Sequence, residues 1–246
     1  MNLKNKLTNQ GNFLFRHRSF LPLLLIPVIL LGIISNTIII QNPILNLSYN
    51  LICIFITLSG FIVRIITIGH APRGTSGRNR YNQVAHKLNT TGMYSIVRNP
   101  LYLGNFLMGL GVTIYVRSIY TVFIFMLIFF LYYERIIYVE EAFLAEKFKD
   151  KFIAWVNETP IFIPNFRLWK RSELCFSVTT VLQREYSGFL GSTVSFLFIQ
   201  IFRDYYQSGH LNIKLSYLYI LILAIFITLI LRGLRKCTTL LDKEGR

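Results

Sequence analysis

The sequence predicts an all-α protein, a polytopic transmembrane helical bundle of about six spans. Apolar residues make up 53% of the 246 residues, and charged residues make up only 15%, whereas soluble proteins contain about 25% charged residues. The apolar residues also form long uninterrupted blocks, and about 20 such residues cross the hydrocarbon layer as a helix. A soluble core does not require blocks of this length, so the composition indicates a membrane protein.

Six apolar segments are long enough, or nearly long enough, to cross a membrane. They cover residues 20–40, 47–68, 101–116, 119–138, 186–202 and 215–231. Only Arg117 and Ser118 separate the third from the fourth, so we expect these two to form a tight antiparallel hairpin. We expect the first to be a retained membrane helix, because no small-residue cleavage site of a signal peptide follows it.

The basic residues predict the orientation of the chain. With both termini in the cytoplasm, 22 of the 26 Lys and Arg residues fall in the cytoplasmic segments 1–19, 69–98, 134–185 and 232–246, and three fall on the opposite side. Cytoplasmic loops carry such an excess of positive charge. The net charge of +15 is thereby explained without nucleic acid, which we do not expect as a partner. A composition rich in Ile, Lys, Asn and Leu favours a bacterial inner membrane.

The cysteines predict no special chemistry. Cys53, Cys175 and Cys237 are far apart and odd in number, so they define neither a disulfide framework nor a metal-binding spacing. We expect them to be small apolar side chains and expect no metal ion.

A helix start with anion-binding character is predicted at residues 98–104. Asn99 is a good N-cap residue and Pro100 suits the first helical position. The positive end of the helix dipole then lies beside Arg98, as in known anion sites. Tyr102 and Gly104 fall on the first turns, and Gly104 lets a backbone or a ligand come close. An ordinary capped helix with small packing residues is the alternative.

Two adjacent carboxylates follow the fourth apolar block. Glu140 and Glu141 point about 100° apart on a helix, so one can face inward and one outward. The chain contains only 11 acidic residues. Placing two of them at a membrane exit indicates a cationic ligand group or an Arg partner, although a solvated helix face is the alternative.

A third segment, residues 159–165, has the sequence Thr-Pro-Ile-Phe-Ile-Pro-Asn. Its two prolines, Pro160 and Pro164, fix an extended backbone with apolar side chains between them. Such a segment can fold back as a lid over a site. The alternative is a rigid linker.

In this order, the three segments resemble the isoprenylcysteine carboxyl methyltransferase and phospholipid methyltransferase superfamily. That superfamily has an Arg-His-Pro-x-Tyr-x-Gly run at a helix start, a hairpin helix, Glu-Glu-x-x-Leu, an aromatic-rich helix and a Val-Pro-x-x-Ile-Pro-like stretch. The counterparts in this chain are 98–104, then 140–144, then Phe148, Phe152 and Trp155, and then 159–164. The resemblance covers about residues 50–168. The departures are Asn99 in place of His, Lys149 in place of Gly and Thr159 in place of Val.

The resemblance implies a methyltransferase that uses S-adenosylmethionine and acts on a lipid or lipid-linked acceptor at the cytoplasmic leaflet. It implies catalytic roles for Arg98 and Glu141. It implies a cytoplasm-facing cofactor pocket formed by Tyr94, Arg98, Asn99, Pro100, Tyr102, Gly104, Glu140, Glu141 and Pro164. Methyl transfer requires mainly that donor and acceptor are aligned and kept dry.

Further arginines are candidates for binding the acceptor. The loop after the second apolar block contains Arg73, Arg78 and Arg80 without any acidic residue. These side chains either touch lipid headgroups or hold an anionic lipid substrate. Arg64 lies within the second apolar block, where it either snorkels to the headgroups or faces a polar cavity.

The chain is expected to have three parts: an N-terminal tail with the first transmembrane helix (1–49), a methyltransferase-like membrane core (50–168) and a C-terminal two-helix membrane extension (169–246). Membrane lipids and a lipid-linked substrate are the expected partners. One alternative is a membrane reductase of the sterol-reductase type that uses NADPH, for which the chain is short. Another is a non-enzymatic transporter or channel, although the inverted repeat common in transporters is absent from the sequence.

Overall fold

The computed structural model describes residues 2–35, 38, 40–72, 85–211 and 213–237. Within these residues the chain forms helices and one isolated β-bridge between Gly92 and Lys170. The predicted all-α fold is therefore confirmed for the described part of the chain.

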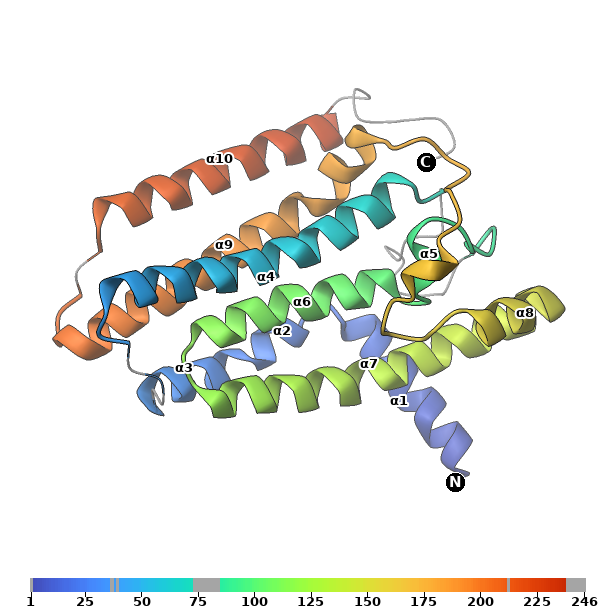
Figure 1. Ribbon diagram of the computed structural model, residues 1–246, viewed down its shortest axis with the longest axis horizontal. Helices are drawn as coiled ribbons and strands as arrows, with labels where there is room; N and C mark the ends of the chain where they lie inside the picture. The colour runs from blue at the N-terminus through green and yellow to red at the C-terminus, as the bar shows by residue number, and fades with distance from the viewer. Residues whose placement is uncertain (1, 36–37, 39, 73–84, 212, 238–246) are drawn as a thin grey trace.

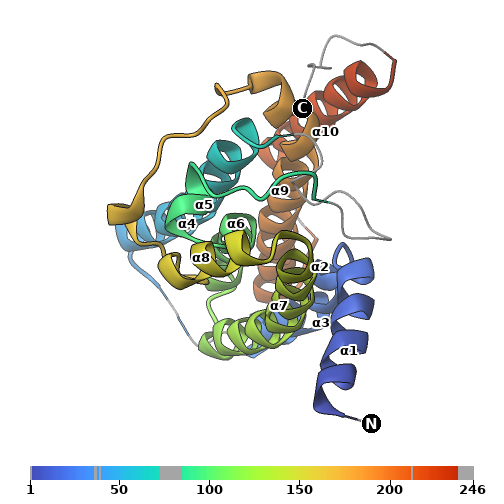
Figure 2. The same cartoon turned by 90° about the vertical axis from the view of Figure 1, so that its right-hand side faces the viewer.

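Five long helices run side by side along the length of the molecule (Figures 1 and 2). They are α4 (Pro43–Gly69), α6 (Pro100–Tyr115), α7 (Ile119–Phe148), α9 (Val178–Ser208) and α10 (Leu215–Cys237). By length and composition, α4, α7 and α10 can cross a membrane. The α6 helix has 16 residues, and the 31 residues of α9 include charged side chains. The second to sixth predicted spans fall on these five helices, so the prediction of a helical membrane bundle is confirmed.

The first predicted span, residues 20–40, is wrong as a single helix. The chain instead forms the short helix α2 (Leu21–Leu24) and the helix α3 (Ile26–Ser35). The ten residues of α3 extend only about 15 Å, half of the hydrocarbon thickness. Pro27 has no N–H to donate to the carbonyl of Leu23, so a continuous helix would lose a hydrogen bond at this point.

The N-terminal residues, expected to be a tail, form the helix α1 (Leu3–His17). This helix packs along the last part of α7, where Gly11 lies directly against the Arg135 backbone and the Val139 side chain. Farther along the chain, Gly32 of α3 lies against Thr121 near the start of α7. The N-terminal segment therefore runs antiparallel to α7 in three helical pieces.

The described parts of the segments predicted to be cytoplasmic gather at one end of the bundle (Figure 1). The short helices α5 (Met93–Ile96), α8 (Asp150–Glu158) and η1 (Phe166–Leu168) lie there, together with α1 and the last described turn of α10. The α6–α7 turn and the connection from α9 to α10 lie at the other end. We call the first end the polar end below; its location on the cytoplasmic side stays a prediction.

The turn between α6 and α7 confirms the predicted hairpin. It consists of residues 116–118, and Arg117 adopts a positive φ of 67°. The Arg117 guanidinium donates hydrogen bonds to the side chains of Asn46 and Asn50 at the start of α4. These contacts fasten the turn to the neighbouring helix.

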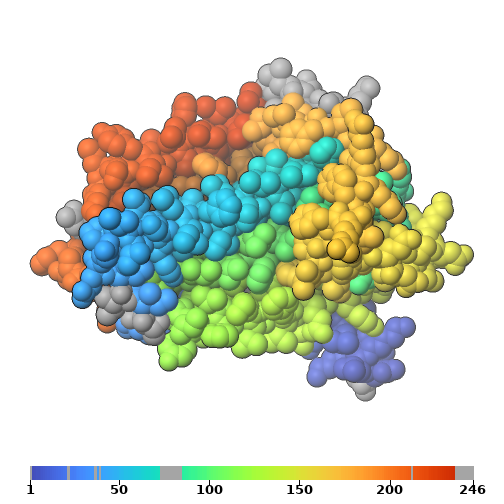
Figure 3. All heavy atoms as spheres, viewed as in Figure 1, coloured from blue at the N-terminus to red at the C-terminus, as the bar shows by residue number. Residues whose placement is uncertain are grey.

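The surface of the bundle is apolar along the outward faces of its helices. Figure 3 shows α4 and α10 at the surface of this face of the molecule. The exposed side chains of α4 include Leu51, Phe55, Leu58 and Ile62, which lie at helical spacing along one side. A soluble protein rarely exposes a continuous apolar strip of this kind, so these residues suit contact with lipid.

The α4 and α6 helices approach closely through glycine. A Cβ atom at Gly111 would lie 2.2 Å from Thr57 Oγ1 and 2.5 Å from the Cys53 carbonyl oxygen. Gly60 and Gly104 face each other in a similar contact farther along the two helices. Small residues permit such approach between membrane helices.

Gly111→Ala is expected to destabilise the protein by about 1–3 kcal/mol, because the added methyl group overpacks this contact. Thermal unfolding of the purified protein in detergent measures the change. Gly191→Ala in α9 is the matched control, since no atom lies within 4 Å of the added Cβ; it is expected to be neutral or stabilising by up to about 1 kcal/mol. Equal stability of both variants would contradict the close packing of α4 on α6.

Candidate active site

The two predicted catalytic residues lie next to each other. Arg98, which precedes α6, and Glu141, near the end of α7, form an ion pair of 3.0 Å between Nη1 and Oε1. Both side chains are largely buried, with 13% and 25% of their surfaces exposed. Arg98 Nε is buried without a hydrogen-bond partner in the described structure, whereas Glu141 Oε1 is the oxygen that faces Arg98 Nη1 in the ion pair. The pair therefore retains hydrogen-bonding capacity that a polar ligand can use.

The segment 159–165 folds back onto the start of α6. The Arg98 N–H donates to the Pro160 carbonyl (2.9 Å), and the Asn165 N–H donates to the Ile96 carbonyl (2.9 Å). Phe162 packs among the aromatic rings of Phe106 and Phe130. The predicted fold-back is thus present, with its apolar side chain anchored between α6 and α7.

Asn99 occupies the N-cap position of α6, but its side chain makes no capping hydrogen bond. The amide Nδ2 instead donates to the Ile161 carbonyl at 3.1 Å. The predicted helix start with Asn99 at the N-cap position is thus present, but the Asn99 side chain supplies no capping hydrogen bond. The Asn99 side chain points to the returning segment, where it binds the Ile161 carbonyl, and not to the first turn of the helix.

Asn99→Ala is expected to loosen the segment 159–165, because the Ile161 carbonyl loses its donor. A net loss of about 1 kcal/mol per hydrogen bond corresponds to roughly fivefold faster local opening. Hydrogen exchange at the Asn165 amide measures this effect. Asn99→His keeps a donor and is expected to behave more like the wild type; unchanged exchange in Asn99→Ala would show that the backbone bonds alone hold the segment.

A cavity of about 690 Å³ lies between Arg98 and the returning segment, a size that suits a small-molecule ligand. Its lining comprises Arg98, Val156, Asn157, Glu158, Thr159, Pro160, Ile163, Pro164, Asn165, Phe166 and Arg167. Of the predicted cofactor-binding residues, Arg98 and Pro164 line this cavity. It lies at the polar end of the bundle, and its identity with the predicted cofactor pocket stays a prediction.

Glu140 points to a different neighbour from Glu141. The Tyr102 hydroxyl of α6 donates to Glu140 Oε2 at 2.7 Å. The two carboxylates therefore point to different partners, Glu141 to Arg98 and Glu140 to Tyr102, and neither of them faces outward as the sequence had allowed.

Tyr94 of α5 lies nearby, and the Trp155 indole N–H donates to its backbone carbonyl at 2.9 Å. Burial, and secondly the Glu140 carboxylate, raise the pKa of Tyr94. Its hydroxyl therefore stays protonated at neutral pH and remains a hydrogen-bond donor.

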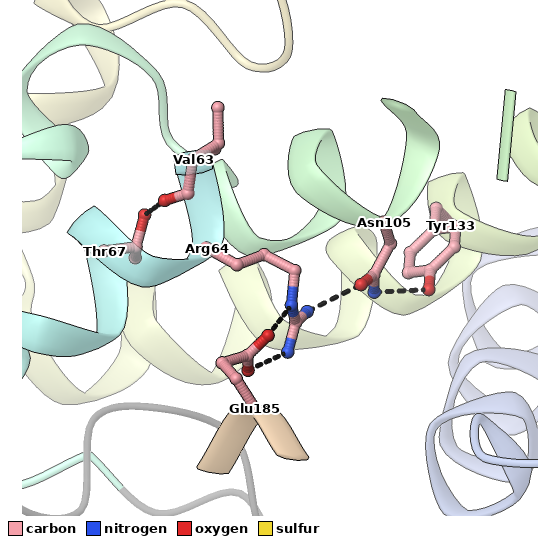
Figure 4. A network of polar contacts seen from close by, with 6 residues as sticks. All are labelled: Val63, Arg64, Thr67, Asn105, Tyr133 and Glu185. Carbon is pink, nitrogen blue, oxygen red and sulfur yellow. Dashed lines mark hydrogen bonds and ion pairs between the residues drawn. The ribbon is translucent and has the colours of Figure 1, made fainter. Parts of the chain in front are cut away.

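Arg64 faces the interior of the bundle (Figure 4). Its guanidinium forms a bidentate pair with Glu185 of α9, with distances of 2.8 and 2.6 Å. Its third nitrogen donates to Asn105 Oδ1 at 2.6 Å. The alternative that Arg64 snorkels to the headgroups is wrong, because Glu185 holds it inside the bundle. Whether Arg64 binds the acceptor stays a prediction.

The remaining predicted residues take different places. Pro100 is fully buried at the first position of α6. A Cβ at Gly104 would lie 2.4 Å from Arg64 Cγ and 2.9 Å from the Gly60 carbonyl oxygen, so Gly104 makes room for α4; a cofactor contact for it stays a prediction. Arg73, Arg78 and Arg80 lie outside the described residues.

The sequence interpretation missed three polar residues of the interior: Asn105, Tyr133 and Glu185. Asn105 follows Tyr102 by three residues, so both lie on one face of α6. Glu185 is one of only 11 acidic residues, and it stands at the start of an apolar block. These two signals were available in the sequence. Their meeting with Arg64 was not, because it depends on the packing of α9.

In the described part of the chain, no three His, Cys, Asp or Glu side chains gather where they could hold a metal ion. The expectation of no metal stays a prediction.

The fold and this polar end define a multi-pass integral membrane protein with a candidate ligand site. A model of the phospholipid methyltransferase family matches residues 47–151. The cobalt-zinc-cadmium resistance protein CzcN of Cupriavidus metallidurans is 30% identical over 156 residues, which cover 61% of this chain and 69% of that protein. The chain therefore belongs to the superfamily of phospholipid methyltransferases and isoprenylcysteine carboxyl methyltransferases, which are membrane methyltransferases, as the sequence motifs indicated.

Two further relatives match shorter parts of the chain. The protein-S-isoprenylcysteine O-methyltransferase of Schizosaccharomyces pombe is 32% identical over 79 residues, 32% of this chain and 34% of that protein. The nickel-cobalt-cadmium resistance protein NccN of Alcaligenes xylosoxydans is 32% identical over 111 residues, 44% of this chain and 52% of that protein. No solved structure matches the chain significantly.

Proposed function

We propose that the protein transfers a methyl group from S-adenosylmethionine to a lipid or lipid-linked acceptor at the cytoplasmic leaflet. The observation that carries the proposal is the largely buried Arg98–Glu141 pair, in which Arg98 has an unpartnered Nε in the described structure and lines a cavity of about 690 Å³. Membership of a membrane methyltransferase superfamily supports the type of reaction.

The residues at the polar end fit the chemical groups of S-adenosylmethionine. Arg98 offers a guanidinium to the cofactor carboxylate, since charge-assisted bonds of this kind are short and strong. Glu141 offers a carboxylate to the cofactor ammonium or ribose. Tyr94, Asn99, Pro100, Tyr102, Gly104, Glu140 and Pro164 complete the proposed binding residues. When bound, the cofactor supplies an electrophilic methyl group on a sulfonium.

In this reaction the protein holds the methyl donor in position and excludes water from the site. The segment 159–165 covers the start of α6 and is anchored by Phe162 between α6 and α7. A dry site strengthens each electrostatic contact and protects the donor. Arg98 and Glu141 are the proposed catalytic residues because they orient the donor; no strong base is required for displacement at a sulfonium.

The acceptor enters this proposal from the membrane. The apolar outward faces of the bundle suit lipid contact, and the excess of basic residues in the segments of the polar end suits the anionic cytoplasmic leaflet. The composition favours a bacterial inner membrane, and the distribution of basic residues predicts that both chain termini lie in the cytoplasm. Arg73, Arg78 and Arg80, which lie outside the described residues, stay proposed binders of an anionic lipid substrate.

Lipid mass spectrometry of cells with and without the gene tests this function. The expected result is a lipid or lipid-linked species that is heavier by one methylene unit only in cells that contain the protein. Cells that express Glu141→Ala are the control and are expected to lack the heavier species. Identical lipid profiles in all three would argue against a lipid acceptor.

A further inference from the structure

A continuous polar network crosses the interior of the bundle between α9, α4, α6 and α7 (Figure 4). It begins at Glu185, which pairs with Arg64 through two hydrogen bonds. Arg64 Nη1 donates to Asn105 Oδ1, and Asn105 Nδ2 donates to the Tyr133 hydroxyl oxygen at 3.0 Å. Membrane interiors contain polar groups mainly where they serve a site.

From Arg64 onward, the hydrogen bonds run in one direction, through Asn105 to Tyr133. Arg64 has only donors, so the atom of Asn105 that faces it must be the carbonyl oxygen. The amide nitrogen of Asn105 then faces Tyr133 and donates to it. Tyr133 therefore acts as the acceptor, and its own O–H must point elsewhere.

The Tyr133 O–H has no acceptor within the described parts of the structure. Only 7% of the residue surface is exposed, so water does not readily supply one. The Tyr133 ring lies against the Tyr102 ring, with a centroid distance of 4.5 Å, and Tyr102 already donates to Glu140. A buried donor without an acceptor is costly, so this hydroxyl is placed for a ligand.

The position of Tyr133 indicates which ligand this is. It precedes Glu140 by seven residues, so its backbone lies about 10 Å farther along α7 from the polar end than that of Glu140. A soluble cofactor enters at the polar end, whereas a lipid-linked acceptor reaches this depth from the membrane. Arg184, which precedes Glu185 in α9, also has a buried Nη1 without a hydrogen-bond partner in the described structure.

We propose that the Tyr133 hydroxyl donates a hydrogen bond to an oxyanion of the methyl acceptor, and that Asn105 is the residue that positions it. A carboxylate or a phosphate offers one oxygen to Tyr133 and keeps a second oxygen as the nucleophile for the methyl group. The inference rests on the proposed methyl transfer, and it makes the C-terminal helix α9 part of the acceptor site through Glu185 and Arg64.

Two nearly isosteric variants test this assignment. Tyr133→Phe removes the hydroxyl and keeps the ring on Tyr102. Asn105→Asp keeps the shape but offers only acceptors, so Tyr133 must turn its proton toward residue 105. Thr67→Val in α4 is the matched control, because Thr67 donates only to the Val63 carbonyl of its own helix (2.6 Å).

Each protein is purified into nanodiscs and supplied with methyl-labelled S-adenosylmethionine and one of three acceptors. These are N-acetyl-S-farnesylcysteine (a carboxylate), undecaprenyl phosphate (a phosphate) and phosphatidylethanolamine (an amine). Thermal unfolding and calorimetric binding of S-adenosylhomocysteine are measured in parallel. Both variants are expected to raise the KM for the oxyanion acceptor about ten- to a hundredfold, as loss of a hydrogen bond to a charged group does, with unchanged S-adenosylhomocysteine affinity.

The double variant separates positioning from a structural role. Because Asn105 acts through Tyr133, Tyr133→Phe with Asn105→Asp is expected to be no worse than Tyr133→Phe alone. Three results would each overturn the assignment while leaving methyl transfer intact. The first is that the KM effects of the two single variants multiply in the double variant. The others are an unchanged KM in Tyr133→Phe and methyl transfer only to phosphatidylethanolamine. Absence of both label transfer and S-adenosylhomocysteine binding in the wild type would instead sink the proposed function, and this inference with it.

Discussion

Replacing Arg98 by Gln is expected to weaken the binding of S-adenosylhomocysteine by about 30- to 100-fold. The ligand carries the same carboxylate and ammonium as the proposed cofactor, and a hydrogen bond to a charged group contributes about 1.5–3 kcal/mol. The loss is expected toward the upper end of this range, because Glu141 is then left half-buried without its cation. Isothermal titration calorimetry in detergent measures the affinity.

Arg171→Gln is the control for this charge change. Arg171 is exposed, follows the cavity-lining segment and is not part of the cavity wall. It removes the same charge from the polar end, so a long-range effect of net charge would appear in both variants. Equal affinities of Arg98→Gln and the wild type would contradict the proposed role of the Arg98–Glu141 pair in cofactor binding.

Replacing Glu185 by Leu is expected to cost about 3–5 kcal/mol of stability. Only 7% of the Glu185 side chain and 19% of the Arg64 side chain are exposed, and removal of one partner leaves a buried charge uncompensated. The double variant Arg64→Met with Glu185→Leu removes both charges. It is expected to recover most of the lost stability, because a buried ion pair replaced by apolar residues is often neutral.

Thermal unfolding in detergent measures both variants, and the yield of monodisperse protein gives a second readout. If Glu185→Leu were as stable as the wild type, the pair would have to be solvated in the membrane protein. If the double variant were as unstable as the single one, the two side chains would stabilise the fold through packing and not through their charges.

Much of the fold can be predicted from the sequence because each membrane helix corresponds to one long run of apolar residues. The apolar blocks within residues 43–69 and 215–237 fall on α4 and α10, and the two residues Arg117 and Ser118 are enough to indicate the hairpin. The first apolar block, residues 20–40, was not predicted correctly. Its apolar composition indicated one long helix. Pro27 has no N–H for the hydrogen bond of a continuous helix, so the chain forms α2 and α3 as separate helices. An average over the composition of the block does not show the effect of this one residue.

The candidate site could likewise be predicted only in part from the sequence. Arg98, Glu140 and Glu141 were selected from local motifs, and the structure brings them into contact with polar partners. The contact between Asn99 and Ile161 and the network that joins Glu185 to Tyr133 depend on segments far apart in the chain. Such contacts follow from how helices pack, so a single sequence does not specify them.

The most direct test of the account is transfer of a labelled methyl group by the purified protein. Wild-type protein in nanodiscs is incubated with methyl-labelled S-adenosylmethionine and membrane lipids, and the lipid-extractable label is measured. The expected result is label in a lipid or lipid-linked product, together with its loss in Arg98→Gln and its retention in Arg171→Gln. Lipid-extractable label that never exceeds the protein-free control, in a preparation that is folded and monodisperse, would contradict the assignment of this chain as an active lipid methyltransferase.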